Sequence, residues 1–177
     1  MKTLLINFFG GPGVGKSTAA SWMFYKLKEL GKEAEFVSEY AKGKVWENDA
    51  VAFSQTDEYY INAKQAHYLS RVFKKVEFVV TDAPLRGGIP FVIRPGLQQA
   101  IREEADLYKD CEINFFIARQ HKYKTIGRIE TEDYAAVIDS KILEELNATG
   151  ISYIVVEPTM KGYKMALKKA LEKMRTL

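Results

Sequence analysis

Residues 8–18 read FFGGPGVGKST, and this stretch decides the fold. It satisfies the phosphate-loop pattern G-x-x-x-x-G-K-[ST], with the first glycine at Gly10 and the lysine at Lys16. Glycines let the backbone turn its N–H groups toward a phosphate, and the helix that starts near Gly15 adds the partial positive charge of its N-terminus. The stretch therefore predicts a nucleotide site. Its expected residues are Gly11, Pro12, Gly13, Val14, Gly15, Lys16, Ser17 and Thr18.

The same loop predicts two bound groups. In P-loop enzymes the lysine reaches the β- and γ-phosphates of the nucleotide, and the hydroxyl residue after it holds Mg²⁺. We therefore expect Lys16 to bind the terminal phosphates of ATP and Ser17 to bind Mg²⁺.

Short apolar runs alternate with longer helical patterns along the whole chain. The expected strands are residues 3–9, 34–38, 76–81, 113–118 and 152–156, and the expected helices are residues 15–30, 57–75, 97–107, 131–148 and 161–174. Continuous apolar runs are typical of strands buried on both faces of a parallel sheet. Gly31 and Gly150 stand where two helices should stop. The succession predicts a single α/β domain over residues 1–177, with a parallel five-stranded sheet and helices on both faces.

Composition sets limits on the class of protein. Apolar residues make up 47% of the 177 residues, and 26 Lys and Arg against 23 acids give a net charge of +3, which permits a phosphate-rich partner without demanding one. Cys111 is the single cysteine, so a disulfide framework and a cysteine-based zinc site are excluded and a cytoplasmic location is expected. The start, MKTLLINFF, is too short to span a membrane and is predicted to be a buried strand; no membrane partner is expected.

Two acidic residues follow expected strands, at the edge where ligands collect in an open parallel sheet. Asp82 ends the run EFVVTDAP, and Glu39 ends the run FVSEYAK. We expect Asp82 to order Mg²⁺ or to accept the proton of an attacking hydroxyl, and Glu39 to serve as a second base or as a substrate anchor. The alternatives are a turn-forming role for Asp82 beside Pro84 and an ordinary surface position for Glu39.

A basic stretch follows the fourth expected strand. From Arg119 to Ile129 it contains no acid and four cations, which are Arg119, Lys122, Lys124 and Arg128. Arginines stabilise charge on a phosphoryl group in transfer, and a lid that carries them expels water. We therefore expect residues 119–130 to form a short basic lid in which Arg119 and Arg128 are catalytic. A solvated basic loop is the alternative.

The remaining pattern favours a kinase. The Asn-Lys-x-Asp base reader of GTPases is absent from the sequence, and the large ring ATPases usually need a longer chain with a separate helical lid domain. The acceptor pocket is expected between the second and third strands, within residues 48–73, where aromatic side chains are frequent. Aromatic residues at helical spacing are more often core than ligand contacts, but the Gln65 amide is a candidate for binding the substrate.

The chain resembles the small P-loop kinases encoded by bacteriophages, which are related to DNA 5-hydroxymethyl-pyrimidine kinases and to ribosylnicotinamide kinase domains. Four stretches carry the resemblance over residues 3–157: FFGGPGVGKST, EYAKGKVWE, VVTDAPL and RQHKYKTIGRIETEDYA. The resemblance implies a P-loop NTPase fold of the nucleoside and nucleotide kinase type and an ATP site at residues 11–18. It also implies a strand-end acid at Asp82 and lid cations at Arg119 and Arg128.

This sequence departs from the family pattern after the third strand. The family commonly reads TDSPL where this chain has TDAPL, so Ala83 lacks a hydroxyl. Arg86 stands where relatives often have apolar residues, which makes it a candidate for binding an acceptor phosphate.

The leading hypothesis is ATP-dependent phosphorylation of a 5-hydroxymethyl pyrimidine in phage DNA, because some kinases of this family act on that group. The expected substrate-binding residues are Glu39, Gln65 and Arg86. One alternative is a small-molecule nucleoside or nucleoside monophosphate kinase. Another is a nucleotide-dependent binding module that hydrolyses ATP slowly.

Overall fold

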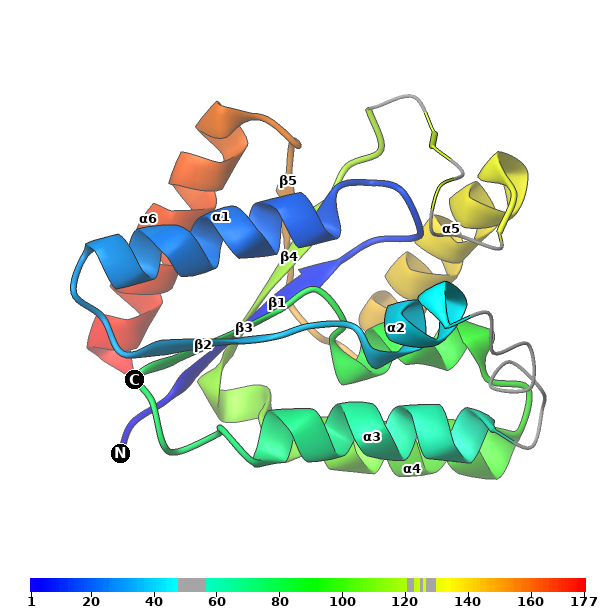
Figure 1. The fold of residues 1–177 in the computed structure, drawn as a ribbon. Helices are drawn as coiled ribbons and strands as arrows, with labels where there is room; N and C mark the ends of the chain where they lie inside the picture. The colour runs from blue at the N-terminus through cyan, green and yellow to red at the C-terminus, as the bar shows by residue number, and fades with distance from the viewer. Residues whose placement is uncertain (48–56, 121–122, 125, 127–129) are drawn as a thin grey trace.

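The apolar run before the phosphate loop forms the central strand of a five-stranded sheet in a computed structural model of the protein (Figure 1). The structure describes residues 1–47, 57–120, 123–124, 126 and 130–177. In spatial order the strands are β2 (Ala34–Val37), β3 (Phe78–Thr81), β1 (Leu4–Phe9), β4 (Glu112–Ile117) and β5 (Ile154–Val156). Each neighbouring pair is parallel, so the predicted five-stranded parallel sheet is confirmed.

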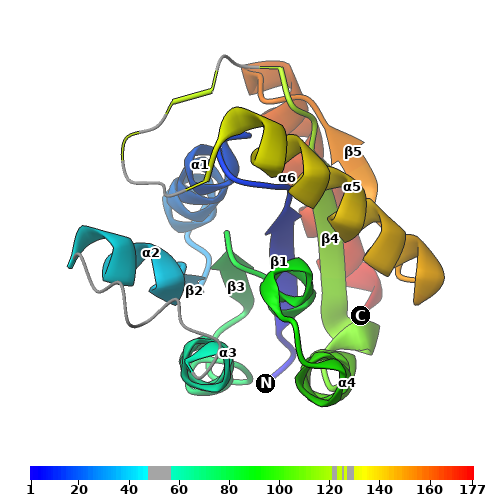
Figure 2. The ribbon, with the colours of Figure 1, turned by 90° about the vertical axis from the view of Figure 1, so that its right-hand side faces the viewer.

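Helices cover both faces of this sheet. They are α1 (Lys16–Glu29), α2 (Tyr40–Trp46), α3 (Glu58–Ser70), α4 (Pro95–Asp106), α5 (Glu132–Ala148) and α6 (Met160–Thr176), with the 3-10 segments η2 (Leu85–Phe91) and η3 (Lys109–Cys111). α1 and α6 pack on one face, whereas α3, η2, α4 and α5 pack on the other (Figures 1 and 2). This arrangement confirms the α/β fold that the sequence predicts.

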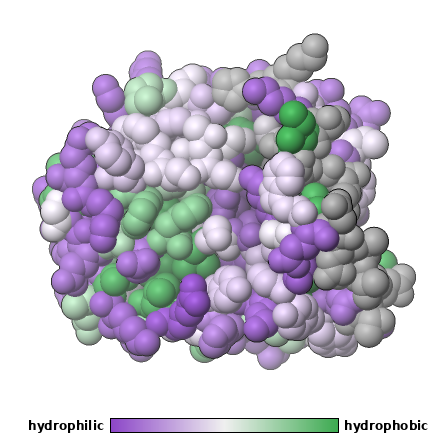
Figure 3. Space-filling view, in the orientation of Figure 1, coloured by the Kyte–Doolittle hydropathy of each residue, from purple (hydrophilic) through white to green (hydrophobic). Residues whose placement is uncertain are grey.

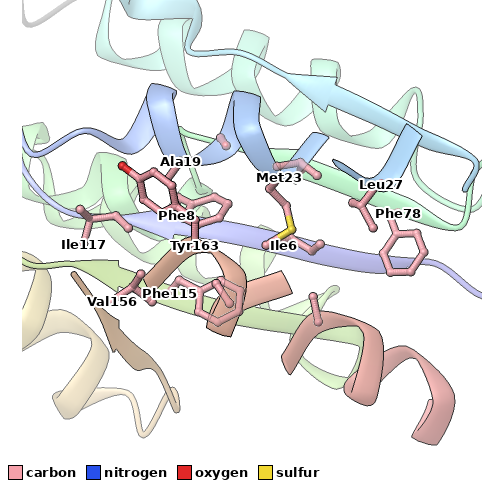
Figure 4. Close-up of a cluster of buried hydrophobic side chains, with 14 of the residues drawn as sticks. Ile6, Phe8, Ala19, Met23, Leu27, Phe78, Phe115, Ile117, Val156 and Tyr163 are labelled. Atoms are coloured by element: carbon pink, nitrogen blue, oxygen red, sulfur yellow. The ribbon is translucent and has the colours of Figure 1, made fainter. Parts of the chain in front are cut away.

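The alternation of side chains along β1 explains how one strand builds both layers of the core. Ile6 and Phe8 point to the α1 and α6 side, where they pack in a cluster with Met23 of α1 and Tyr163 of α6 (Figure 4). Leu5 points to the opposite face, into the cluster built by α3, η2 and α4. Because both faces are buried, β1 is apolar at every position except Asn7 and does not alternate between apolar and polar residues.

Local chemistry sets several helix boundaries. Gly31 and Gly150 adopt positive φ angles of 71° and 68° directly after α1 and α5, as their predicted role as helix stops requires. Thr131 begins α5 by accepting a hydrogen bond from the N–H of Tyr134 at 3.3 Å. Pro95 opens α4, where its missing N–H costs no helical hydrogen bond.

Two local predictions differ from the structure. Residues 57–75 were expected to be one helix, but α3 ends at Ser70 and Lys74 then adopts a left-handed backbone with φ of 64°. Helix α2 was not predicted, because its seven residues include Gly43 and none is buried, so the segment carries no apolar periodicity.

The face shown in Figure 3 carries many hydrophilic residues, with a group of hydrophobic side chains just below α1. Among the helices in the described ranges, none combines the length and the apolar character needed to cross a membrane.

Candidate active site

The phosphate loop connects β1 to α1 in the cradle conformation that its glycines predict. Gly10, Gly13 and Gly15 have φ angles of 135°, 85° and 101°, which L-residues with side chains rarely adopt. No side chain in the described part of the chain caps the first turn of α1, so its N–H groups are available to an anion. The loop therefore fits the phosphates of a nucleotide.

Lys16 lies at the start of α1 and points back over the loop. Its Nζ donates a hydrogen bond to the carbonyl oxygen of Gly11 at 3.0 Å. Burial lowers the pKa of Lys16, and the carboxylates of Glu39, Asp82 and Asp139 oppose that shift. A phosphate bound in the loop would add a further negative charge beside this amine and stabilise its charged form.

The two predicted strand-end carboxylates lie together at the carboxyl edge of the sheet. Asp82 follows β3 and is 3% exposed, and Glu39 lies between β2 and α2. The backbone N–H of Glu39 donates a hydrogen bond to Oδ1 of Asp82 at 3.2 Å. Burial raises the pKa of Glu39, with Lys16 acting in the opposite direction and Asp82 in the same one. A carboxyl with a raised pKa is a better proton acceptor near neutral pH than an exposed one.

Gln65 of α3 lies beside these carboxylates, but its amide is already engaged. Its Oε1 accepts a hydrogen bond from the N–H of Tyr40 at 2.9 Å, and its Nε2 donates to the carbonyl oxygen of Ser38 at 3.4 Å. Gln65 is 8% exposed and still lines the cavity described below. The amide thus fixes the turn that carries Glu39, whereas the sequence predicted direct binding of the substrate.

One cavity of about 670 Å³ joins the phosphate loop to the carboxylates. The side of the cavity that would bind the nucleotide includes six of the predicted ATP-site residues, which are Pro12, Gly13, Gly15, Lys16, Ser17 and Thr18. Its other walls come from α2, α3 and η2, including Ala41, Ile61, Asn62, Gly88 and Phe91. Of the predicted ATP-site residues, Gly11 and Val14 do not line this cavity; Val14 is 1% exposed and packs in the core. The volume is typical of small-molecule sites.

The residues present fit a magnesium ion of the kind that P-loop enzymes use. Ser17 offers a hydroxyl and Asp82 a carboxylate to the cavity that Lys16 also lines, and hard oxygen ligands are those that Mg²⁺ prefers. In the described ranges no group of three or more His, Cys, Asp or Glu residues is arranged to hold a metal on its own. An ion that shares its coordination with nucleotide phosphates and water needs no such group.

Arg119, the first predicted lid cation, lies beside the phosphate loop. Its Nε donates a hydrogen bond to Oδ2 of Asp139 at 2.6 Å, and its Nη2 donates to the carbonyl oxygen of Ala135 at 3.2 Å. Asp139 is a site residue that sequence reasoning missed, because nothing in its local pattern distinguishes it from other polar residues of α5. Arg128, the second predicted lid cation, lies outside the described residues, as do parts of the predicted lid 119–130.

Arg86 does not lie at the cavity. It is 4% exposed and forms ion pairs with Asp106 of α4 and with Glu145 of α5, the latter at 3.6 Å. Arg102 shares Glu145 through two hydrogen bonds at 2.9 and 2.7 Å. The candidate phosphate-binding role of Arg86 is therefore left out of the site, because its guanidinium is turned into the layer between η2, α4 and α5.

The structure combines a phosphate loop with a five-stranded parallel α/β fold, and solved structures of kinases share this fold. No protein-family profile and no curated protein matches the sequence. The structure of NadR protein in complex with NR matches with a TM-score of 0.76 and 15% identity, covering 99% of this chain and 52% of that chain. This protein thus spans about half the length of that one. Thymidylate kinase from Ehrlichia chaffeensis matches with a TM-score of 0.66 and 13% identity, over 97% of this chain and 98% of that chain.

Proposed function

We propose that the protein is an ATP-dependent kinase that transfers the γ-phosphoryl group to a hydroxyl of a nucleoside-like acceptor. The observation that carries this proposal is the placement of Glu39 and Asp82 in one cavity with the phosphate loop. A protein that only hydrolyses or senses ATP does not require a second pocket, beyond the strand-end carboxylates, in which an acceptor could bind. The kinase neighbours in fold support the same class of reaction.

The chemistry divides among the residues of the cavity. Glu39 accepts the proton of the acceptor hydroxyl, whose oxygen forms a bond to the γ-phosphorus while the bond to the ADP oxygen breaks. The sequence predicts Asp82 as the proton acceptor and Glu39 as a second base; the burial of Glu39 in the cavity, which raises its pKa, favours Glu39. Lys16 holds the terminal phosphates, and Ser17 and Asp82 hold Mg²⁺. The ion, when bound, neutralises charge on the phosphates.

The charges around the acceptor space favour an acceptor without a phosphate at its reacting end. Glu39, Glu58 and Asp82 line this part of the cavity, and Lys42 is the cation among the described residues on its α2 wall. Arg86, which would be placed to bind an acceptor phosphate if it faced the cavity, is paired elsewhere. A neutral hydroxymethyl base or a nucleoside suits this space better than a nucleoside monophosphate.

A surface on the outside of α2 and α3 supports a polymeric acceptor. Tyrosine rings and cations interleave there, with each cation 4.6–5.8 Å from the centre of its ring and the rings in edge contact. We call this the aromatic–basic strip; it comprises Tyr40, Tyr60, Tyr68, Lys44, Lys64 and Arg71. Cations and aromatic rings together are the groups that bind single-stranded nucleic acid. The first acceptor proposed is therefore a 5-hydroxymethyl pyrimidine in DNA, and a free nucleoside is the second.

The acceptor is tested by incubating the protein with Mg²⁺ and γ-labelled ATP in the presence of matched substrates. The panel holds DNA with 5-hydroxymethyluracil, DNA with 5-hydroxymethylcytosine, the same DNA with unmodified bases, free nucleosides and nucleoside monophosphates. We expect label in hydroxymethylated DNA and none in the unmodified strands. Thymine lacks only the hydroxyl of 5-hydroxymethyluracil, and cytosine lacks the whole hydroxymethyl group of 5-hydroxymethylcytosine. If only nucleosides are labelled, the acceptor is a free nucleoside, the second candidate, and not DNA. Label in nucleoside monophosphates alone would contradict the charge argument.

A further inference from the structure

Asp139 joins three parts of the donor site through one carboxylate. It lies in the middle of α5, and its side chain is 15% exposed. Its Oδ1 accepts a hydrogen bond from the N–H of Gly11 in the phosphate loop at 2.5 Å, and its Oδ2 accepts from Nε of Arg119 at 2.6 Å. Helix α5 is thereby fixed both to the loop and to the residue that follows β4.

The packing at this junction is tight enough to fix the loop against the helix. A Cβ on Gly11 would lie 2.5 Å from the carbonyl oxygen of Ala135, 2.8 Å from Oδ1 of Asp139 and 3.1 Å from Nη2 of Arg119. All three distances are shorter than an ordinary van der Waals contact with carbon. Gly11 occupies a variable position of the phosphate-loop pattern, so the close approach of α5, and not the pattern, requires a glycine here.

The guanidinium of Arg119 is oriented by these contacts. Two of its nitrogens are engaged, Nε by Asp139 and Nη2 by the carbonyl oxygen of Ala135. The third, Nη1, is buried, and no atom of the described residues accepts a hydrogen bond from it. A Cβ on Gly13 would lie 3.7 Å from Nη1, so this nitrogen borders the phosphate loop. A buried donor without a partner is costly unless a ligand supplies the acceptor.

We infer that Asp139 is a positioning residue, which holds Arg119 so that its Nη1 donates to a phosphate of the nucleotide bound in the loop. The inference rests on the proposed nucleotide-dependent function. Arg119 touches the phosphate, and Asp139 acts through Arg119. The carboxylate also offsets the positive charge that Arg119 and Lys16 place beside each other before a nucleotide binds, since Asp139 raises and Arg119 lowers the pKa of Lys16.

The test is a double-substitution cycle measured by binding and without any acceptor. The affinities for MgATP, inorganic tripolyphosphate and adenosine are determined by calorimetry for the wild type, Asp139→Asn, Arg119→Met and the double variant. Asparagine is nearly isosteric, but it has a single acceptor oxygen for two donors. Asp133→Asn, in the exposed first turn of the same helix, is the matched control.

We expect Arg119→Met to weaken binding of MgATP and tripolyphosphate about tenfold or more, because a hydrogen bond to a charged group is lost. Asp139→Asn should weaken both about fivefold, and the control should change neither. In the Arg119→Met background the Asp139 substitution should cost less than about twofold, because its partner is gone. Adenosine, which has no phosphate, should bind all four proteins equally.

Equal losses from Asp139→Asn in both backgrounds would overturn the inference, because they would show that Asp139 acts independently of Arg119. The inference would also be overturned if the substitutions weakened the binding of adenosine as much as the binding of tripolyphosphate. If Asp139→Asn does not fold, the variant Arg119→Lys is used in its place. Lysine keeps the ion pair with Asp139 but lacks the Nη1 donor. The melting temperature should therefore stay near that of the wild type, while the affinity for tripolyphosphate should fall. Retained affinity in Arg119→Lys would contradict the inference. If the double-substitution cycle gives the expected affinities but no acceptor of the panel is phosphorylated, the proposed kinase function is contradicted and the inference about Asp139 stands.

Discussion

The backbone N–H of Glu39 donates a hydrogen bond to the carboxylate of Asp82 across the carboxyl ends of two neighbouring strands. The bond places the α-carbon of one acid beside the side chain of the other, and it leaves the carboxyl group of Glu39 free to face the cavity. Two buried acids so close to each other are an unfavourable arrangement for stability, and the charge of Lys16 offsets part of that cost. Such arrangements are common where a site requires a proton acceptor and a metal ligand together.

The first prediction concerns Glu39 and stability. Because burial raises the pKa of Glu39, the folded protein binds its proton more tightly than the unfolded chain does. Its favourable contribution is therefore complete at low pH and is lost as the pH rises through the raised pKa. At pH 8 Glu39→Gln should raise the melting temperature, and this gain should shrink as the pH is lowered toward 4.5. A gain that is the same at both pH values would contradict the buried ionised carboxylate.

The same variant should lose activity. If Glu39 accepts the proton of the acceptor, Glu39→Gln should lower kcat about a hundredfold or more while nucleotide affinity changes little. Steady-state transfer rates and calorimetric ATP affinity measure the two effects separately. If kcat is unchanged in Glu39→Gln, Glu39 is not the proton acceptor and Asp82 is the remaining candidate.

Lys16 gives the second test of the site. Lys16→Ala should lower kcat/KM for ATP about a hundredfold or more, because a charge that stabilises the moving phosphoryl group is removed. The fold should be retained, since this amine donates its hydrogen bond to the loop itself. Lys168→Ala, whose side chain is 76% exposed on α6, is the control and should behave as the wild type. Near-normal activity of Lys16→Ala would contradict the assignment of the phosphate site.

Gly11 and Gly43 form a matched pair for the packing of α5 against the loop. Gly11→Ala should destabilise the protein by about 1–3 kcal/mol, because its Cβ overlaps the carbonyl oxygen of Ala135. A Cβ on Gly43, inside α2, meets no atom of the described residues within 4 Å, so Gly43→Ala should stabilise by about 0.5–1 kcal/mol. Urea unfolding of both variants checks the contrast. Equal effects would show that the loop relaxes away from α5.

Arg86 is expected to matter for stability and not for the acceptor. Arg86→Met leaves the buried Glu145 with one remaining cation and should cost about 3 kcal/mol. Arg102→Met, whose arginine is 29% exposed, should cost less. The KM for the acceptor, measured at a temperature where each variant is folded, should stay within about twofold. A large and selective rise of this KM in Arg86→Met would restore the role that the sequence predicted.

The sequence allowed the frame of the site to be predicted because the relevant signals are local. The phosphate loop is a contiguous pattern, parallel strands are continuous apolar runs, and Asp82 and Glu39 stand at strand ends. Strand ends in a parallel sheet meet at one edge whatever the intervening helices do. Those rules predict that Lys16, Glu39 and Asp82 lie at one edge of the sheet, and in the structure all three line one cavity.

The side-chain partners that sequence reasoning did not predict lie far along the chain. Whether Arg86 faces the cavity is decided by Asp106 and Glu145, which belong to two later helices. Gln65 lines the cavity as expected, yet its amide is held by the backbone of Ser38 and Tyr40. Asp139 has no local signature, because its importance comes from the approach of Gly11 and Arg119. Side-chain pairing across elements is a tertiary property that neither periodicity nor spacing reports.

The most direct measurement follows the γ-phosphate of labelled ATP in a single reaction of the protein with Mg²⁺ and DNA that contains 5-hydroxymethyluracil, compared with thymine DNA of the same sequence. The label should appear on the hydroxymethylated strand, at a rate far above the release of inorganic phosphate, and Glu39→Gln should abolish this transfer. Release of all the label as inorganic phosphate, with no transfer to hydroxymethylated DNA or to any nucleoside, would contradict a kinase.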